Sequence, residues 1–190
     1  MSEKFRILIV IDMQKDFVDG SLGTPEAQAI VPAVEARISG GDYDGIIFTY
    51  DTHYENYMDT LEGKKLPVPH CIDGTEGWKP AVRNAGVPGS RSVIKNTFGS
   101  LTLDAAVREI MEEYAGRTGK SPRIGDTEFI MCGLCTDICV ISNALILRAK
   151  YPDNIITVDA RCCAGTTPEA HRAALTVMRS CQIDVINDEQ

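Results

Sequence analysis

Cys139 lies in the stretch of the sequence that most strongly suggests chemistry, residues 131–140. This stretch begins as the end of an apolar strand, turns at Gly133 and continues into a helix that we expect to run to about Ala149. Thr136 is a good N-cap for that helix, which places Cys139 in its first turn. Because the positive end of a helix lowers the pKa of a thiol, the pattern of strand, turn, helix and cysteine predicts an activated nucleophile.

Two other interpretations of this stretch have to be weighed. A free cysteine is most often a small buried hydrophobe, so Cys139 alone does not establish a catalytic site. Cys132 and Cys135 form a C-x-x-C pair, which is the spacing of thiol–disulfide oxidoreductases. Against that activity, Cys132 falls inside the predicted strand, and the six predicted strands exceed a thioredoxin-like core.

A second set of residues could hold a metal ion. The chain has three histidines, and two of them, His53 and His70, fall in an irregular stretch that begins just after Asp51. One carboxylate and two imidazoles suit a zinc, iron or manganese ion that keeps open positions. The alternative is that both are ordinary surface residues of a loop. The third histidine, His171, lies in the last predicted helix, and we expect it at the surface.

The elements that must position these residues alternate between strands and helices. Buried strands are predicted at residues 5–11, 45–50, 92–94, 128–132, 154–158 and 183–186. Helices are predicted at residues 24–39, 103–117, about 137–149 and 167–180. Residues 52–90 are predicted to form one long, irregular, functional loop. The alternation predicts one domain over residues 1–190, a three-layer α/β/α fold with an open, mainly parallel, six-stranded sheet of the Rossmann-like kind.

Reactive side chains follow several of these strands. In open parallel sheets, sites form outside the carboxyl ends of the strands. Asp12, Asp51 and Lys95 stand at three such ends, and Cys139 comes just after a fourth. One polar residue at a strand end is unremarkable because a loop begins there, but four reactive groups at four ends are hard to assign to packing.

Several short segments, in this order and spacing, resemble the isochorismatase-like cysteine hydrolases, and within them the nicotinamidases. They are residues 11–17, 51–53 and 69–71, Lys95 and residues 133–140. The resemblance implies the isochorismatase-like fold and a catalytic triad of Asp12, Lys95 and Cys139. The chemistry agrees, because a carboxylate beside a thiol can accept its proton and later protonate a leaving amine, while an ammonium group keeps that carboxylate ionised.

The resemblance also implies the surroundings of the triad. The backbone N–H groups of Cys135 and Cys139 would hold the oxyanion, and the Leu134–Cys135 peptide bond would be cis. Phe17 and Phe98 match positions that sandwich a pyridine ring, although both residues could equally serve core packing.

For the metal, the resemblance implies Asp51, His53 and His70 as ligands, with zinc expected first and iron or manganese as alternatives. Glu62 is a candidate fourth ligand, and Glu55 and Asp59 are its nearby rivals.

The activity that the resemblance implies is that of a nicotinamidase, which converts nicotinamide and water to nicotinate and ammonia through a thioester, a reaction of NAD salvage. The alternative is a hydrolase of carbamoyl or ureido amides, whose members commonly lack the metal cluster. One departure bears on the substrate. Many nicotinamidases carry an aromatic residue just before the proline–histidine pair, whereas Leu66, Pro67 and Val68 stand there in this chain. Trp78 is a candidate for supplying the ring from further along.

Composition narrows the partners and the setting. The net charge of −8 argues against binding to nucleic acid or to an anionic membrane surface, and no apolar run approaches the length of a membrane span. The first residues lead directly into a strand and do not resemble a signal peptide. Seven cysteines without such a signal suggest a reducing, cytoplasmic setting. We expect a small-molecule amide as the substrate and a homo-oligomer as the assembly.

Overall fold

A six-stranded parallel sheet forms the centre of the computed structural model, which describes residues 4–83, 87 and 89–188. The strand order is β3-β2-β1-β4-β5-β6, and every paired neighbour is parallel. The strands are β1 Phe5–Ile11, β2 Gly45–Asp51, β3 Ser90–Lys95, β4 Thr127–Leu134, β5 Ile155–Ala164 and β6 Asp184–Ile186. The predicted six-stranded sheet is confirmed.

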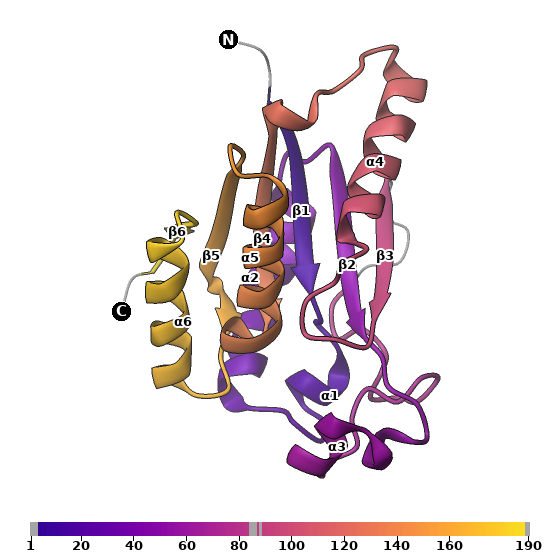
Figure 1. Ribbon diagram of the computed structural model, residues 1–190, viewed down its shortest axis with the longest axis vertical. Coiled ribbons are helices and arrows are strands. Elements are labelled where there is room, and N and C mark those ends of the chain that lie inside the picture. The colour runs from indigo at the N-terminus through magenta and orange to yellow at the C-terminus, as the bar shows by residue number, and fades with distance from the viewer. Residues whose placement is uncertain (1–3, 84–86, 88, 189–190) are drawn as a thin grey trace.

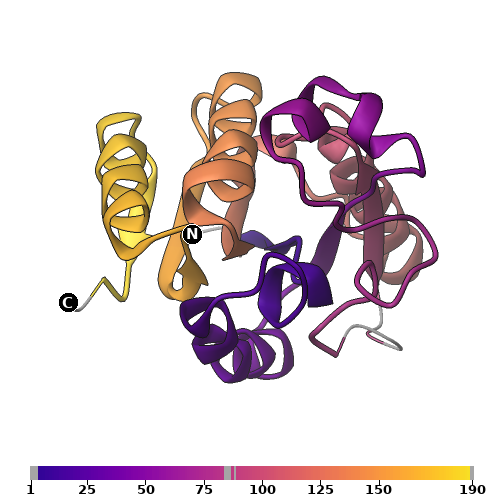
Figure 2. The same cartoon turned by 90° about the horizontal axis from the view of Figure 1, so that it is seen from below.

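Helices cover both faces of this sheet. They are α1 Lys15–Val18, α2 Pro25–Gly40, α3 Leu61–Lys65, α4 Leu103–Thr118, α5 Ile141–Lys150 and α6 Pro168–Ser180, with short 3₁₀ turns at Tyr57–Asp59 and Ile124–Asp126 and a π-helical turn at Thr136–Val140. Figure 2 shows α2 on one face and α4, α5 and α6 on the other, which confirms the three-layer α/β/α prediction. The short α1 and α3 lie beyond the carboxyl ends of the strands (Figure 1).

The sequence explains why these elements form. The side chains of β1, β2 and β4 are buried almost without exception, as expected for parallel strands covered on both faces. Thr24 and Thr167 cap α2 and α6, since each hydroxyl accepts a hydrogen bond from the backbone N–H three residues later. A proline follows each cap at the first helical position, where its missing N–H does no harm. Within the described residues, no helix combines the length and apolarity that crossing a bilayer requires.

The turn before Cys139 differs from its prediction. β4 continues through Gly133 to Leu134, and Gly133 has a φ of 121°. A Cβ at Gly133 would lie 2.1 Å from the carbonyl oxygen of Ile11, so only glycine lets the ends of β4 and β1 approach this closely. The helical path then opens with a π-helical turn whose N-cap is Cys135, and Thr136 lies inside it without capping it. Such turns are frequent at functional sites.

Two other segments also differ from their predictions. The loop over residues 52–90 contains the 3₁₀ turn and α3 as well as irregular chain. β5 runs on to Ala164, so Asp159 and the pair Cys162 and Cys163 lie inside the strand rather than after it. Asp159 is tolerated there because its carboxylate pairs with Arg37 of α2 at 3.0 Å.

Candidate active site and metal centre

Lys95 links the reactive groups predicted at the strand ends. Its Nζ lies 2.6 Å from Oδ2 of Asp12, 3.4 Å from Oδ1 of Asp51 and 3.6 Å from Sγ of Cys139. Lys95 and Asp51 end β3 and β2, Asp12 directly follows β1, and Cys139 lies in the turn after β4. These four strands lie side by side in the sheet, in the order β3-β2-β1-β4. All of them are buried. The structure therefore brings the predicted triad residues together.

Thr49 holds Asp12 in place from the neighbouring strand β2. Its hydroxyl donates to Oδ1 of Asp12 at 2.6 Å, and the backbone N–H of Asp12 points back at that hydroxyl and at the Thr49 carbonyl. Asp12 has a φ of 45°, a left-handed conformation that few non-glycine residues adopt and that is frequent at functional sites. With Thr49 on one oxygen and Lys95 on the other, the carboxylate is fixed on both sides. Sequence reasoning missed Thr49, although a hydroxyl within an apolar strand was a signal.

The charges of the Asp12–Lys95 pair support each other inside the protein. Burial raises the pKa of Asp12, and the adjacent ammonium of Lys95 opposes this rise. Burial would lower the pKa of Lys95, but the negative charges of Asp12, Cys139 and Asp51 raise it above its usual value. Lys95 therefore stays protonated, while Asp12 is a stronger base than an exposed aspartate.

The thiol of Cys139 does not show the lowered pKa that the sequence suggested. Cys139 is only 5% exposed. Burial raises the pKa of its thiol well above the usual value, and the negative charge of Asp12 adds to this rise. The ammonium of Lys95 opposes this rise but does not cancel it. A thiol in this setting keeps its proton until a neighbouring base removes it, and Asp12 is the base that faces it.

Asn143 joins the cysteine turn to the segment after β3. Its Nδ2 donates to the carbonyl of Cys139 at 2.8 Å and to that of Phe98 at 3.2 Å, and its Oδ1 accepts from the backbone N–H of Ser100 at 2.9 Å. The side chain is fully buried. Asn143 thereby holds two walls of the site together, a role that sequence reasoning missed although an amide among apolar helix residues was visible.

Helix α6 braces the other side of the turn. His171 is 5% exposed, and its Nδ1 lies 2.8 Å from the hydroxyl of Thr136. The expectation of a surface histidine is therefore wrong, because α6 turns this residue inward against the turn. Asp137 accepts hydrogen bonds from the backbone N–H and the hydroxyl of Thr166. The Leu134–Cys135 peptide bond is cis, as the resemblance implied.

The second cluster meets beside this group. Oδ2 of Asp51 lies 2.9 Å from Nε2 of His53 and 3.5 Å from Nε2 of His70, and all three residues are buried. Nδ1 of His70 lies 2.8 Å from the Val68 carbonyl, so a neutral ring carries its proton there and offers Nε2 as an electron-pair donor. The alternative that both histidines are ordinary surface residues of a loop is therefore wrong.

These donors fit a metal ion. The candidate ligand atoms of Asp51, His53 and His70 all lie within 4.8 Å of one another. Nε2 of His53 is buried without a well-formed hydrogen bond, although it lies close to Asp51, and a buried polar atom left in this way calls for a partner such as an ion. Oε1 of Glu62, on α3, lies 3.7 Å from both Nε2 atoms, which makes Glu62 the candidate fourth ligand rather than Glu55 or Asp59.

Two further side chains hold the backbone of this cluster. Oε1 of Gln14 accepts from the N–H of Asp51 at 2.7 Å, and its Nε2 donates to the Asp51 carbonyl at 2.9 Å. Oδ2 of Asp16 accepts from the N–H of Cys71, directly after His70, at 2.7 Å. Both residues belong to the segment that follows β1, so the same segment positions the cysteine site and the metal ligands.

A cavity of about 680 Å³ opens over these groups, with Cys139, Asp51 and His70 in its lining. Phe17 and Phe98 both line it; Phe17 is buried with its ring centroid 5.4 Å from that of His70, whereas Phe98 is 50% exposed. Trp78 does not line the cavity, because its ring packs against Tyr50 and its Nε1 donates to Thr52. The suggestion that Trp78 supplies a pocket ring is therefore wrong.

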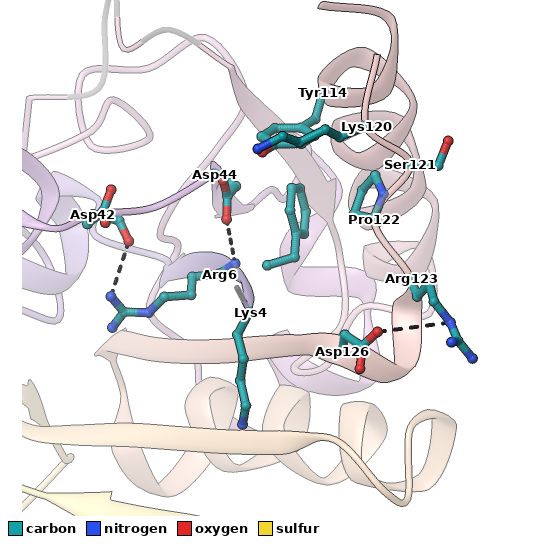
Figure 3. Close-up of a pocket in the computed structure, with 11 residues that line it drawn as sticks. Lys4, Arg6, Asp42, Asp44, Tyr114, Lys120, Ser121, Pro122, Arg123 and Asp126 are labelled. Atoms are coloured by element: carbon teal, nitrogen blue, oxygen red, sulfur yellow. Dashed lines mark hydrogen bonds and ion pairs between the residues drawn. The ribbon is translucent and has the colours of Figure 1, made fainter. Parts of the chain in front are cut away.

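A second cavity, of about 500 Å³, lies near the start of β1, at the opposite end of the sheet (Figure 3). Several of its polar groups are already hydrogen-bonded or paired. The backbone N–H of Arg6 donates to the Asp44 carboxylate, the guanidinium of Arg6 donates to the backbone carbonyl of Asp42, and Arg123 pairs with Asp126. It contains none of the reactive residues described above.

The remaining cysteines are not arranged for thiol–disulfide exchange. All seven cysteines are free. Cys132 is fully buried in β4, and burial raises its pKa well above the usual value. Burial likewise raises the pKa of Cys135 to about 12. Exchange requires an accessible, readily ionised thiol, so the C-x-x-C interpretation has no support in the structure.

Comparisons with known proteins identify a family and several relatives of this chain. The isochorismatase domain matches residues 6–190. A nicotinamidase of Schizosaccharomyces pombe is 25% identical over 217 residues, covering 96% of this chain and 93% of that protein. The crystal structure of nicotinamidase PncA from Bacillus subtilis is 28% identical, with a TM-score of 0.71, and covers 95% of this chain and 98% of its own. The structure of a pyrazinamidase of Pyrococcus horikoshii in complex with zinc is 25% identical. It covers 95% of this chain and 98% of its own, with a TM-score of 0.71.

The domain match covers the sheet apart from Phe5 and every residue of the candidate site. The fold, the convergence of Asp12, Lys95 and Cys139, and the adjacent Asp–His–His cluster are thus found in a chain that resembles nicotinamidases along nearly its full length. The chain belongs to the isochorismatase family of hydrolases.

Proposed function

We propose that this protein is a cysteine-dependent amidohydrolase that acts on nicotinamide, releasing ammonia and nicotinate. The observation that carries the proposal is the position of Lys95, whose ammonium touches the Asp12 carboxylate and the Cys139 thiol at the same time. A nucleophile, a base and a group that stabilises their charge are the parts that acyl transfer needs. Nicotinamide is proposed as the amide because nicotinamidases are among the relatives of this chain.

The reaction begins with a proton transfer. Asp12 accepts the proton of the Cys139 thiol, and Lys95 stabilises the thiolate through its positive charge. The sulfur attacks the amide carbonyl carbon, forming a C–S bond. As the C–N bond breaks, Asp12 gives its proton to the leaving nitrogen, which departs as ammonia. Asp12 then accepts a proton from water, which hydrolyses the thioester, and the carboxylic acid leaves with Cys139 restored.

The π-helical turn supplies the remaining stabilisation. Cys135 is the N-cap of this turn and Cys139 lies within it, in a region where backbone N–H groups are not all used within the helix. In this proposal their N–H groups receive the negative charge that develops on the carbonyl oxygen, a contribution that is typically worth ~10²–10³ in rate for one donor. Asn143 and His171 keep the turn in position from two sides.

Asp51, His53 and His70 are the proposed ligands of a divalent transition metal, with Glu62 as a direct or indirect fourth partner. Zinc is proposed first because imidazole and carboxylate ligands suit it and because the related pyrazinamidase of P. horikoshii was solved with zinc. When bound, the ion supplies a Lewis acid that can hold an electron-pair donor of the substrate next to the thiol. Lys95 also contacts Asp51, so one ammonium neutralises both the base and a metal ligand.

An ammonia-release assay on purified protein tests the proposal. Nicotinamide, pyrazinamide and carbamoyl amides such as N-carbamoylsarcosine are compared at equal concentration, with zinc present. We expect turnover of nicotinamide and pyrazinamide well above that of the carbamoyl compounds, because only the former offer a ring nitrogen to a metal at Asp51, His53 and His70. Preferential hydrolysis of the carbamoyl compounds would replace the proposed substrate with the alternative one.

A further inference from the structure

The cavity above Cys139 is much larger than a single six-membered ring requires. Its volume of about 680 Å³ lies in the range of pockets that enclose drug-sized ligands. The reactive groups occupy only part of the lining, namely Cys139 with Asp51, His70 and Glu62. A pyridine carboxamide seated at these groups would leave most of the cavity free for a further group of the substrate.

The rest of the lining is mainly apolar. It includes two aromatic rings and several aliphatic side chains: Phe17, Leu22, Leu61, Leu66, Phe98 and Ile138. Leu61 is 71% exposed although it is a large hydrophobe, and Phe98 is 50% exposed. Apolar side chains that face a concave site and are not covered by the protein itself mark a surface for an apolar ligand.

Hydrogen bonds hold the walls that carry these side chains in place. The hydroxyl of Tyr57 donates to the carbonyl of Leu66 at 2.9 Å, and the hydroxyl of Thr60 caps α3 by accepting from the N–H of Gly63 at 3.0 Å. On the opposite side, Asn143 holds the Phe98 carbonyl. The apolar walls are therefore built into the fold, and binding an apolar group would require little reordering of the backbone.

We propose that the preferred substrate is a primary aryl or heteroaryl carboxamide that carries a further apolar group, such as a second ring, in contact with Leu61, Leu66 and Phe98. This inference rests on the proposed amidohydrolase function and specifies its substrate class. Leu66 lines this side of the cavity with an aliphatic side chain that leaves room for such a group.

The test compares kcat/KM for nicotinamide, 5-phenylnicotinamide and 6-phenylnicotinamide, measured by ammonia release. The kcat/KM of at least one phenyl compound should exceed that of nicotinamide by about tenfold or more, because covering a ring with apolar surface strengthens binding by at least that factor. Hydrolysis of nicotinamide without any advantage for either phenyl compound would overturn the inference and leave the proposed function standing. Absence of hydrolysis for all primary amides would overturn both.

A matched pair of variants assigns the advantage to the cavity wall. Leu61→Ser should lower the ratio of kcat/KM for the preferred phenyl compound over nicotinamide severalfold. Leu101→Ser is the control, because Leu101 is 85% exposed and lies outside the cavity lining, and it should leave the ratio unchanged. A ratio that is equal in the Leu61→Ser protein and the parent would contradict the inference.

Discussion

At the scale of single residues, Lys95 has the most consequential position in the molecule. It is buried, and its ammonium lies between two carboxylates and a thiol. Because its pKa is raised by these neighbours, it carries its charge across the whole pH range in which proteins are handled. Without that charge, the negative charges of Asp12 and Asp51 would face each other in a buried site.

Replacement of Lys95 by methionine tests this position. Lys95→Met should lower kcat for the best amide by ~10²–10⁴, because an uncharged side chain stabilises neither the thiolate nor the ionised base. Lys79→Met is the control, since Lys79 is exposed and pairs with Glu76 away from the thiol. Thermal unfolding of both variants separates a catalytic effect from a loss of folded protein. A folded Lys95→Met protein with the parent kcat would show that the charge is not used.

At the scale of elements, the π-helical turn depends on α6. His171 is the residue of α6 that reaches the turn, through the hydroxyl of Thr136. Burial lowers the pKa of His171, and the carboxylates of Asp188 and Asp137 oppose this effect only in part. The folded protein therefore holds a neutral imidazole at a pH where the unfolded chain would already bind a proton.

The lowered pKa of His171 makes the free energy of unfolding depend on pH. Since the unfolded chain binds the proton more readily, the contribution of His171 to the free energy of unfolding is fully present above pH ~6.5 and is lost as the pH falls below it. Urea unfolding at pH 7.5 and pH 5.5 should show a larger loss of stability in the parent than in His171→Gln, which cannot titrate. The contributions of groups common to both proteins cancel in this comparison. Equal losses in the two proteins would refute the role of His171.

The elements that the sequence predicted well are those that local pattern determines. β1 and β2 are apolar runs, and α2 and α6 carry a threonine cap followed by proline, so their limits could be read directly. The strand ends then placed Asp12, Asp51 and Lys95 correctly.

The elements that were misjudged depend on distant partners. The strand predicted over residues 154–158 stops just before Asp159, but Arg37 of α2 neutralises that carboxylate and β5 continues past it. The burial of His171, the pairing of Thr49 with Asp12 and the clamp formed by Asn143 likewise depend on segments far away in the chain. The raised pKa of Cys139 follows from burial, which helix position alone does not reveal.

At the scale of the whole molecule, the site lies where the direction of the strand order reverses. The sheet runs β3-β2-β1 on one side and β4-β5-β6 on the other, so chain segments leave β1 and β4 in opposite directions. A crevice forms at such a switch point beyond the carboxyl ends of the strands. Asp12 follows β1 and Cys139 follows β4, while the metal cluster begins at Asp51, the last residue of β2.

The metal cluster predicts the composition of the purified protein. Elemental analysis should find one divalent transition metal per chain, with zinc as the expected element. His53→Ala and His70→Ala should lose most of the metal and the amide hydrolysis together, because each removes one of the few ligands. His171→Gln is a matched control that removes a histidine outside the cluster and should keep its metal. Full hydrolytic activity in metal-free protein would exclude a role for the cluster in the reaction.

The central claim is that Cys139 is the nucleophile of an amidohydrolase, and ammonia release by single cysteine variants tests it most directly. Cys181→Ala serves as the control, because Cys181 is half-buried at the end of α6, away from Asp12 and Lys95. Hydrolysis of nicotinamide should be undetectable in Cys139→Ala and close to the parent rate in Cys181→Ala and Cys132→Ala. Hydrolysis by a folded Cys139→Ala protein at the parent rate would contradict the account.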